Sequence, residues 1–254
     1  MMPTPKTHRF RRIVCGVDFS PHSARALRYA VLLSPGADAV VTAVHAADPM
    51  LSAAMPAGAA GFAQAAQQDL DRFVRHTLGD VAAARVLTTV VTGRPGAALI
   101  AEARRRRAEV IVLGTNGRRG VPRLFFGSTA QAVLRRFAGA VLVVPPRCKS
   151  PVPGWPTSVL AAIEPDAHRR AHMGAAAKVA EYFGAWLAVM PAAPLPRGAT
   201  LPGLIIYPLP LAGRARMLRQ GSTSYAFICA SRAPVLVIRA GRRHGAAAVQ
   251  RRAA

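Results

Sequence analysis

Three glycines and two hydroxyl residues stand at spacings that suit a phosphate-binding loop. Gly114, Gly117 and Gly127 follow the pattern G-x2-G-x9-G, and Ser128 and Thr129 come directly after the last glycine. The stretch that Ser128 opens is predicted to be a helix, and hydroxyls and free backbone N–H groups at a helix start suit an anion. The pattern is neither G-x-G-x-x-G nor a Walker A loop, because no G-K-[ST] occurs in the chain. The spacing therefore predicts a phosphate cradle of another type.

Few other residues are arranged for catalysis or for a tightly bound metal. Of seven histidines, only His168 and His172 stand at i, i+4, and no third ligand is near them. We interpret this pair as a solvated helix face. The carboxylates of the first half are dispersed, and only Asp18 is placed to meet the cradle or a Mg²⁺ ion beside it. The cysteines are far apart and show no C-x-x-C spacing, so we expect inert thiols at Cys15, Cys148 and Cys229. The sequence supports binding better than turnover.

Alternating strand and helix patterns place the cradle in a parallel sheet. Apolar runs predict strands at Ile13 to Val17, Ala39 to Ala46, Val86 to Val91, Val110 to Leu113 and Val141 to Val144. Helical patterns lie between them at 21–33, 66–77, 97–107 and 128–137, and we expect residues 49–61 to be a mobile excursion over the site. This order predicts an α/β fold with an open, doubly wound, Rossmann-like parallel sheet.

Asp18 follows the first predicted strand and precedes the first predicted helix. In a parallel sheet it would lie at the carboxyl edge, where ligands of open α/β sheets bind. The alternative is that Asp18 only helps to cap the helix, which has Ser20 in the N-cap position before Pro21. Both interpretations stay open at this point.

The chain beyond the proline-rich segment at 148–156 repeats itself weakly. Ser158 to Asp166 echoes the first strand at an offset of 146, and Gly221-Ser222-Thr223 echoes Gly127-Ser128-Thr129 at an offset of 94. The second half therefore lacks about 52 residues, roughly one strand and one helix. Pro208 and Leu211 take the places of the first two cradle glycines. We predict an intact domain over 8–147 and a shortened, degenerate one over 157–240, whose closing strands pair or pack together.

The charge balance is strongly basic, with 34 Lys and Arg against 11 Asp and Glu. Such a field attracts polyanions, but the basic residues are scattered along the sequence and no recognised nucleic-acid motif is present. We therefore favour a solvated arginine-rich surface over a nucleic-acid partner. Arg118, Arg119 and Arg123 differ from the rest because they lie inside the cradle. No apolar run approaches the roughly 20 uncharged residues of a membrane span, so we expect a cytoplasmic protein without membrane contact.

The cradle, with VIVLG before it and AVLVV after it, resembles the nucleotide loop of the universal stress protein family. RIVCGVDFS, from Arg12 to Ser20, and TAVHAADP, from Thr42 to Pro49, resemble the first two strands of that family. The resemblance covers residues 10–146. It implies the adenine nucleotide alpha hydrolase-like fold, ATP as the ligand with Mg²⁺ left open, and a regulatory role in stress responses without catalytic residues. By the same resemblance Asp18 and Ala46 would contact adenosine, and the ribose and phosphates would be contacted by Gly114, Asn116, Gly117, Gly127, Ser128 and Thr129.

Some residues depart from the family pattern. Asn116 stands where bulkier or basic residues are frequent, and Ala130 replaces a hydroxyl. The predicted protein is a tandem form in which an ATP-binding first copy packs against a non-binding second copy as an internal pseudo-dimer, with a further homodimer left open. Two other functions remain: a slow ATPase or phosphotransferase, and a basic protein that binds polyanions such as nucleic acid.

Overall fold

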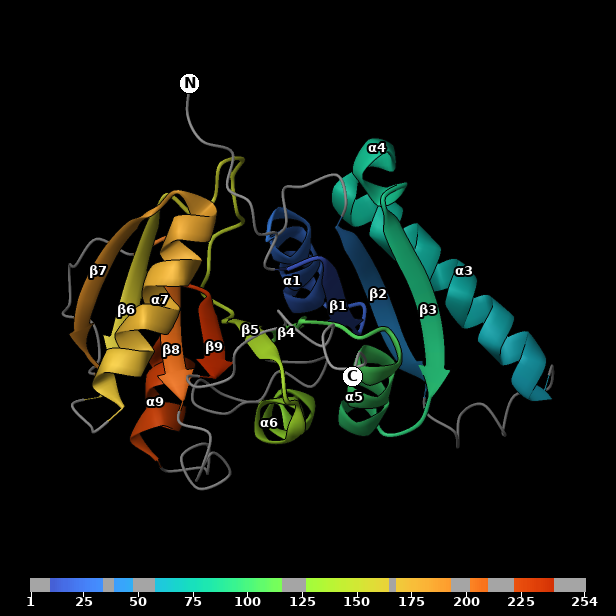
Figure 1. Ribbon diagram of the computed structural model, residues 1–254. Helices are drawn as coiled ribbons and strands as arrows, with labels where there is room; N and C mark the ends of the chain where they lie inside the picture. The colour runs from blue at the N-terminus through green and yellow to red at the C-terminus, as the bar shows by residue number, and fades with distance from the viewer. Residues whose placement is uncertain are drawn as a thin grey trace, which may run out of the picture.

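The computed structural model describes residues 10–33, 39–47, 58–115, 127–164, 168–192, 202–209 and 222–239, and of Gly58, Ala59 and Thr223 only the backbone. These residues form a 9-stranded sheet in the order β3-β2-β1-β4-β5-β9-β8-β6-β7. Helices cover both faces of the sheet (Figure 1). The predicted α/β fold class is confirmed, and five strands come from the first half and four from the second.

The first half follows the predicted order of strands and helices. Its elements are β1 (Arg12–Val17), α1 (Pro21–Leu32), β2 (Val40–Ala47), α3 (Gly58–Leu78), α4 (Asp80–Ala83), β3 (Val86–Thr92), α5 (Pro95–Arg105), β4 (Val110–Gly114), α6 (Ser128–Arg136) and β5 (Ala140–Val144). All paired strands among these are parallel. The excursion predicted for 49–61 is wrong at its end, because α3 already begins at Gly58, and residues 48–57 lie outside the described residues. The one-turn helix α4 was not predicted.

The central strands form because their residues suit burial on both faces. Every residue of β5 and the first four of β4 are buried, as expected for apolar β-branched runs in a parallel sheet. Side chains that alternate along the strands fill two cores. One core contains residues of α1, α3 and α7, and the other contains residues of α5, α6 and α9. Both cores continue from the first half into the second.

The second half consists of β6 (Ser158–Ile163), α7 (Arg169–Phe183), β7 (Trp186–Pro191), β8 (Leu204–Leu209), α9 (Thr223–Ala230) and β9 (Val235–Arg239). Its first strand–helix–strand unit is as long as that of the first half, because Arg12 pairs with Val40 and Ser158 pairs with Trp186.

The same equality holds for the closing unit of each half. Gly114 pairs with Val144, and Pro208 pairs with Ile238, which is the same distance along the chain. The shortening therefore falls between β7 and β8. Within the described residues β7 is the outer strand of the second half, whereas the first half has β3 beyond β2.

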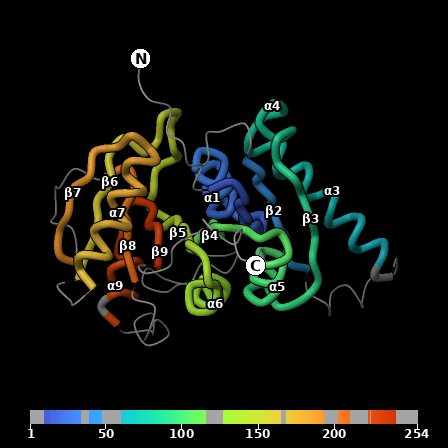
Figure 2. Tube along the Cα trace, in the orientation of Figure 1, coloured from blue at the N-terminus to red at the C-terminus, as the bar shows by residue number. Residues whose placement is uncertain are grey.

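The two halves join through their closing strands. Strand β5 pairs with β9 in antiparallel fashion, with Leu142 opposite Leu236, which confirms the predicted pairing of closing strands within one chain. Figure 2 shows the trace of the second half, yellow to red, on one side of this junction and that of the first half on the other. The ring of Trp155 lies 4.8 Å from that of Tyr29 in α1 and 6.0 Å from that of Phe183 in α7. The halves therefore share one sheet and continuous cores.

Candidate functional site

The order of the strands creates a switch point between β1 and β4. These strands are neighbours, but the chain leaves β1 toward β2 on one side and leaves β4 toward β5 on the other. Ligands of open α/β sheets bind at such a point, outside the carboxyl ends of the strands. Asp18 follows β1 there, and Gly114 ends β4. Because Val17 pairs with His45, the next residue of β2, Ala46, reaches the same edge.

The ends of the cradle loop are held together at this edge. The Gly127 N–H donates to the Thr115 carbonyl at 2.7 Å, and the Thr115 N–H donates to the Val144 carbonyl at 3.2 Å. The chain that leaves the sheet after β4 therefore returns to the same place to begin α6. This hydrogen bond brings Gly127 and Ser128 beside Gly114, as the sequence predicts.

No described side chain caps the start of α6. Gly127 is the N-cap and offers no side chain to the first-turn N–H groups, and the first turn holds no acidic residue. Ser128 is exposed and Thr129 is half-buried, and neither hydroxyl has a hydrogen bond within the described part of the chain. A helix N-terminus with unsatisfied N–H groups and partial positive charge favours a phosphate.

Gly114 has a packing role as well. A Cβ added at this position would lie 3.1 Å from Cβ of His22 and 3.2 Å from its carbonyl carbon and oxygen. Glycine therefore lets the first turn of α1 approach the end of β4 closely, and a larger residue would require this turn to move away. This contact places α1 and the cradle side by side at the switch point.

Asp18 both organises the start of α1 and keeps one oxygen for another partner. Its Oδ1 accepts hydrogen bonds from the Ser20 N–H at 3.1 Å and the Ser20 hydroxyl at 2.6 Å. Ser20 Oγ in turn accepts from the Ser23 N–H at 3.2 Å, as an N-cap does. The capping role is therefore correct. Oδ2 makes no hydrogen bond to any described residue.

Two residues near Asp18 were missed by sequence reasoning. Phe19 has φ of 62°, an unusual left-handed conformation for a bulky residue, and its ring lies 4.5 Å from that of His45 and 5.6 Å from that of Phe73. Burial, with a smaller effect of Arg25, lowers the pKa of His22, whose Nδ1 is buried without a hydrogen bond among the described residues. The position of His22 just after the N-cap was the available signal.

Comparison with known proteins identifies the family. Residues 9–145, more than half of the chain, match the model of the universal stress protein family. The chain belongs to this family. It is 26% identical over 141 residues to a universal stress protein of Methanocaldococcus jannaschii, covering 53% of this chain and 82% of that one. It is 29% identical over 138 residues to a universal stress protein of Thermus aquaticus, covering 53% of this chain and 98% of that one.

A solved structure extends the likeness of fold to the second half. The crystal structure of a universal stress protein from Archaeoglobus fulgidus aligns with 92% of this chain and 100% of its own, with a TM-score of 0.64 and 15% sequence identity. The Rossmann-like fold of the family therefore accounts for nearly the whole chain, and not for the matched residues 9–145 alone.

The structure describes some of the predicted site residues and not others. It brings Asp18, Ala46, Gly114, Gly127, Ser128 and Thr129 to one edge of the sheet. The predicted contacts of Asn116 and Gly117, and of the loop arginines Arg118, Arg119 and Arg123, lie outside the described residues.

Other predictions concern histidines, cysteines and membranes. The solvated face predicted for the histidine pair is wrong for His172, which is 1% exposed because its side of α7 faces the interior. Burial raises the pKa of the Cys148 thiol to about 12 and also raises that of Cys15, in keeping with inert thiols. Searched over the described residues, His, Cys, Asp and Glu form no group of three that could hold a metal. No helix in that part of the chain is long and apolar enough to span a bilayer.

The second half has its own switch point, between β6 and β8, and side chains of the protein occupy it. Glu164 follows β6 as Asp18 follows β1. The Tyr207 hydroxyl of β8 donates to Glu164 Oε1 at 2.7 Å and lies 2.9 Å from Ser224 Oγ at the start of α9. Tyr207 and Ser224 are 1% and 2% exposed. Burial raises the pKa of Tyr207, so this phenol stays protonated and the three polar groups bind one another.

Proposed function

We propose that this universal stress protein binds one ATP per chain at the switch point between β1 and β4. The observation that carries the proposal is the hydrogen bond from Gly127 to Thr115, which sets the uncapped start of α6 beside Asp18 and Gly114. The free oxygen of Asp18 and the small Ala46 would receive the adenosine. The N–H groups and hydroxyls at the start of α6 would receive the phosphates. Membership of the family supports an adenine nucleotide as the ligand.

We further propose that residues 157–240 are a shortened copy that does not bind nucleotide. Two observations support this. Pro208 occupies the strand position that corresponds to Gly114 of the first half. The side chain of Tyr207, hydrogen-bonded to Glu164, occupies the second switch point. This copy would act as the internal pseudo-dimer partner of residues 8–147 by covering the edge of β5.

A nucleotide-dependent regulatory role in the cytoplasm fits this arrangement. Asp18 Oδ2 and the hydroxyls of Ser128 and Thr129 are oxygen ligands of the kind that Mg²⁺ takes beside phosphates. A regulatory role requires only that the ATP-bound and ATP-free forms of the protein differ in a way that a partner recognises. Slow ATP turnover would be a second property of the same site, and release of radiolabelled phosphate in the presence of Mg²⁺ measures it.

Titration calorimetry with ATP, with mass spectrometry of the ligand released from purified protein, tests the proposal. Gly127→Val places a branched side chain where the backbone would approach phosphate, and it should abolish binding. Gly221→Val makes the same change in the corresponding triplet of the second half, and it should leave binding unchanged. Two sites per chain, or loss of binding in the second variant alone, would contradict the assignment of the site to the first half.

A further inference from the structure

Arginines that are scattered in the sequence gather at the amino edge of the first-half sheet. Helix α5 leads into β4 and α6 leads into β5 by short connections, so both helices end where these strands begin. Their ends carry Arg104–Arg107 and Arg135–Arg136. Arg11–Arg12 enter β1 at the same level, because β1 and β4 are paired neighbours. We call these three groups of arginines the basic edge.

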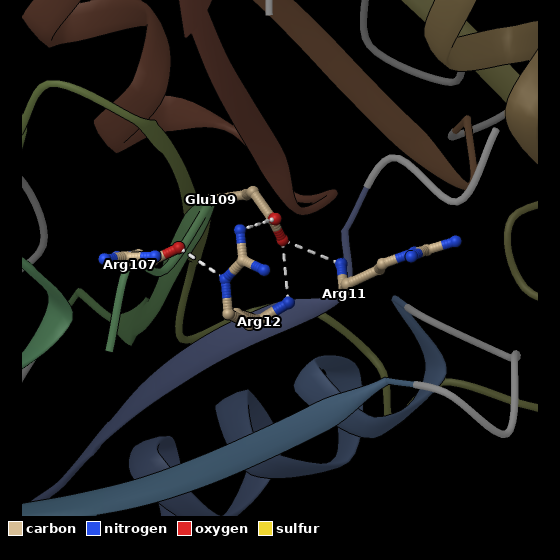
Figure 3. Close-up of polar contacts among 4 residues, drawn as sticks. All are labelled: Arg11, Arg12, Arg107 and Glu109. Carbon is tan, nitrogen blue, oxygen red and sulfur yellow. Dashed lines mark hydrogen bonds and ion pairs between the residues drawn. The ribbon is translucent and has the colours of Figure 1, made fainter. Parts of the chain in front are cut away.

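Hydrogen bonds around Glu109 hold the three groups close together. Arg12 Nε donates to the Arg107 carbonyl at 2.7 Å, and Glu109 Oε2 accepts from the backbone N–H groups of Arg11 and Arg12 at 2.7 Å each (Figure 3). The Ala140 N–H donates to the Glu109 carbonyl at 3.0 Å, which brings the end of α6 alongside. Residues more than ninety positions apart in the chain therefore form one surface.

Carboxylates neutralise only part of this charge. Glu102 is 5% exposed and pairs with Arg105 and Arg106, and Glu109 pairs with Arg12. Arg104, Arg107, Arg135 and Arg136 are exposed and form no ion pair with a described residue. Of the other described carboxylates, Asp69 and Asp71 lie within α3, and Asp80 begins α4, which leads into β3 two strands away from β1. The basic edge therefore keeps a net positive charge that faces solvent.

We propose that the basic edge binds the phosphate backbone of double-stranded nucleic acid without sequence preference. Guanidinium groups match phosphate oxygens in charge and in paired hydrogen-bond geometry. A surface of helix ends positions arginines against phosphates and inserts no element into a groove, so it carries no base readout.

Two other polyanionic partners fit less well. Single strands are bound through exposed aromatic rings on which bases stack, and the nearby Phe10 and Phe137 are each 3% exposed. A lipid surface requires apolar residues beside the charges, and of the exposed large hydrophobic residues that the structure describes, only Val40 adjoins an arginine group, whereas Val81 and Leu87 lie two strands away at the start of β3. The basic edge is opposite the carboxyl edge that holds Asp18, so this proposal does not depend on ATP binding.

Fluorescence anisotropy with a labelled DNA duplex, between about 50 and 200 mM salt, tests the proposal. The variant Arg104→Gln/Arg135→Gln/Arg136→Gln removes three unpaired charges and leaves the contacts of Glu102 and Glu109 in place. It should weaken binding at least about tenfold and reduce the slope of log K against log salt by about two to three.

The matched control removes three exposed arginines at the opposite, carboxyl edge, as Arg94→Gln/Arg147→Gln/Arg232→Gln, with the same change in net charge. It should change the affinity less than about twofold, and melting curves should show that both variants are folded. Equal losses in the two variants would mean that only the overall field attracts DNA, and the proposal would then be wrong. It would also be overturned if the duplex does not bind at the lowest salt, or if anionic vesicles bind the basic edge more tightly than the duplex does.

Discussion

Removal of one hydroxyl should show how strongly the second switch point is closed. In the variant Tyr207→Phe the ring remains, with its centroid 5.4 Å from that of Phe227, so the change is confined to the hydrogen bonds of the phenol. A hydrogen bond to a charged carboxylate contributes about 1.5 to 3 kcal/mol net. In this variant the buried Ser224 hydroxyl would keep only its long hydrogen bond of 3.4 Å to Glu164. Glu164 is half-buried, so a water molecule can replace the hydrogen bond that it loses. We expect a loss of about 2 kcal/mol in the free energy of unfolding.

Urea unfolding followed by circular dichroism measures this loss, and a melting temperature about 4 to 8 °C lower should accompany it. Tyr29→Phe is the matched control, since its hydroxyl donates at 2.9 Å to the neutral Lys149 carbonyl and should cost only about 1 kcal/mol. In a double-mutant cycle with Glu164→Gln, the two changes should couple by about 1 kcal/mol. Equal costs for the two tyrosines, together with simple additivity in the cycle, would refute the reasoning. ATP affinity should stay unchanged, because the hydroxyl belongs to the other switch point.

Two further predictions concern the junction between the halves and the buried thiols. A chain ending at Ser150 exposes the edge of β5, so it should dimerise or aggregate in sedimentation velocity, and a monomer with unchanged thermal stability would contradict the covering role of β9. Burial raises the pKa of Cys148 from 9.0 to about 12, and the unfolded chain releases this proton at lower pH, so the stability that the group contributes is present below pH 9 and is lost as pH rises above it. Melting temperatures should therefore fall less steeply above pH 9 in Cys148→Ala than in the natural chain, and parallel curves would exclude this thiol as a cause.

Much of the fold follows from local patterns in the sequence. Apolar β-branched runs separated by helical periods determine the strands and their order, because a run such as Val141 to Val144 suits only a strand that is buried on both faces. The offset of 94 between the two GST triplets agrees with the register of the closing strands, in which Pro208 takes the place of Gly114, whereas the equal length of the two opening units was not predicted. The pairing of β5 with β9 followed from the need to cover an apolar edge.

Features that depend on side-chain surroundings were beyond the sequence. Phe19 is a typical strand residue, and its left-handed backbone is stabilised by rings from β2 and α3 that only the folded chain brings near. From the sequence alone His172 is expected on the polar face of a helix, and only the packing of α7 shows that it is buried. Tyr207 is typical of a strand, and its hydrogen bond to Glu164 forms only because the sheet places β6 beside β8. The arginines at the ends of α5 and α6 look scattered for the same reason.

The antiparallel junction of β5 and β9 also affects how the chain folds during its synthesis. A ribosome adds roughly 5 to 20 residues per second, and domains generally fold as units while synthesis continues. The first half can therefore complete its parallel sheet while the chain from Val144 to Arg239 is still being made, which takes roughly 5 to 20 s. During this interval β5 is an apolar edge that β9 does not yet cover. The late arrival of β9 makes the order of synthesis, as much as final stability, a condition for burying this edge within one chain.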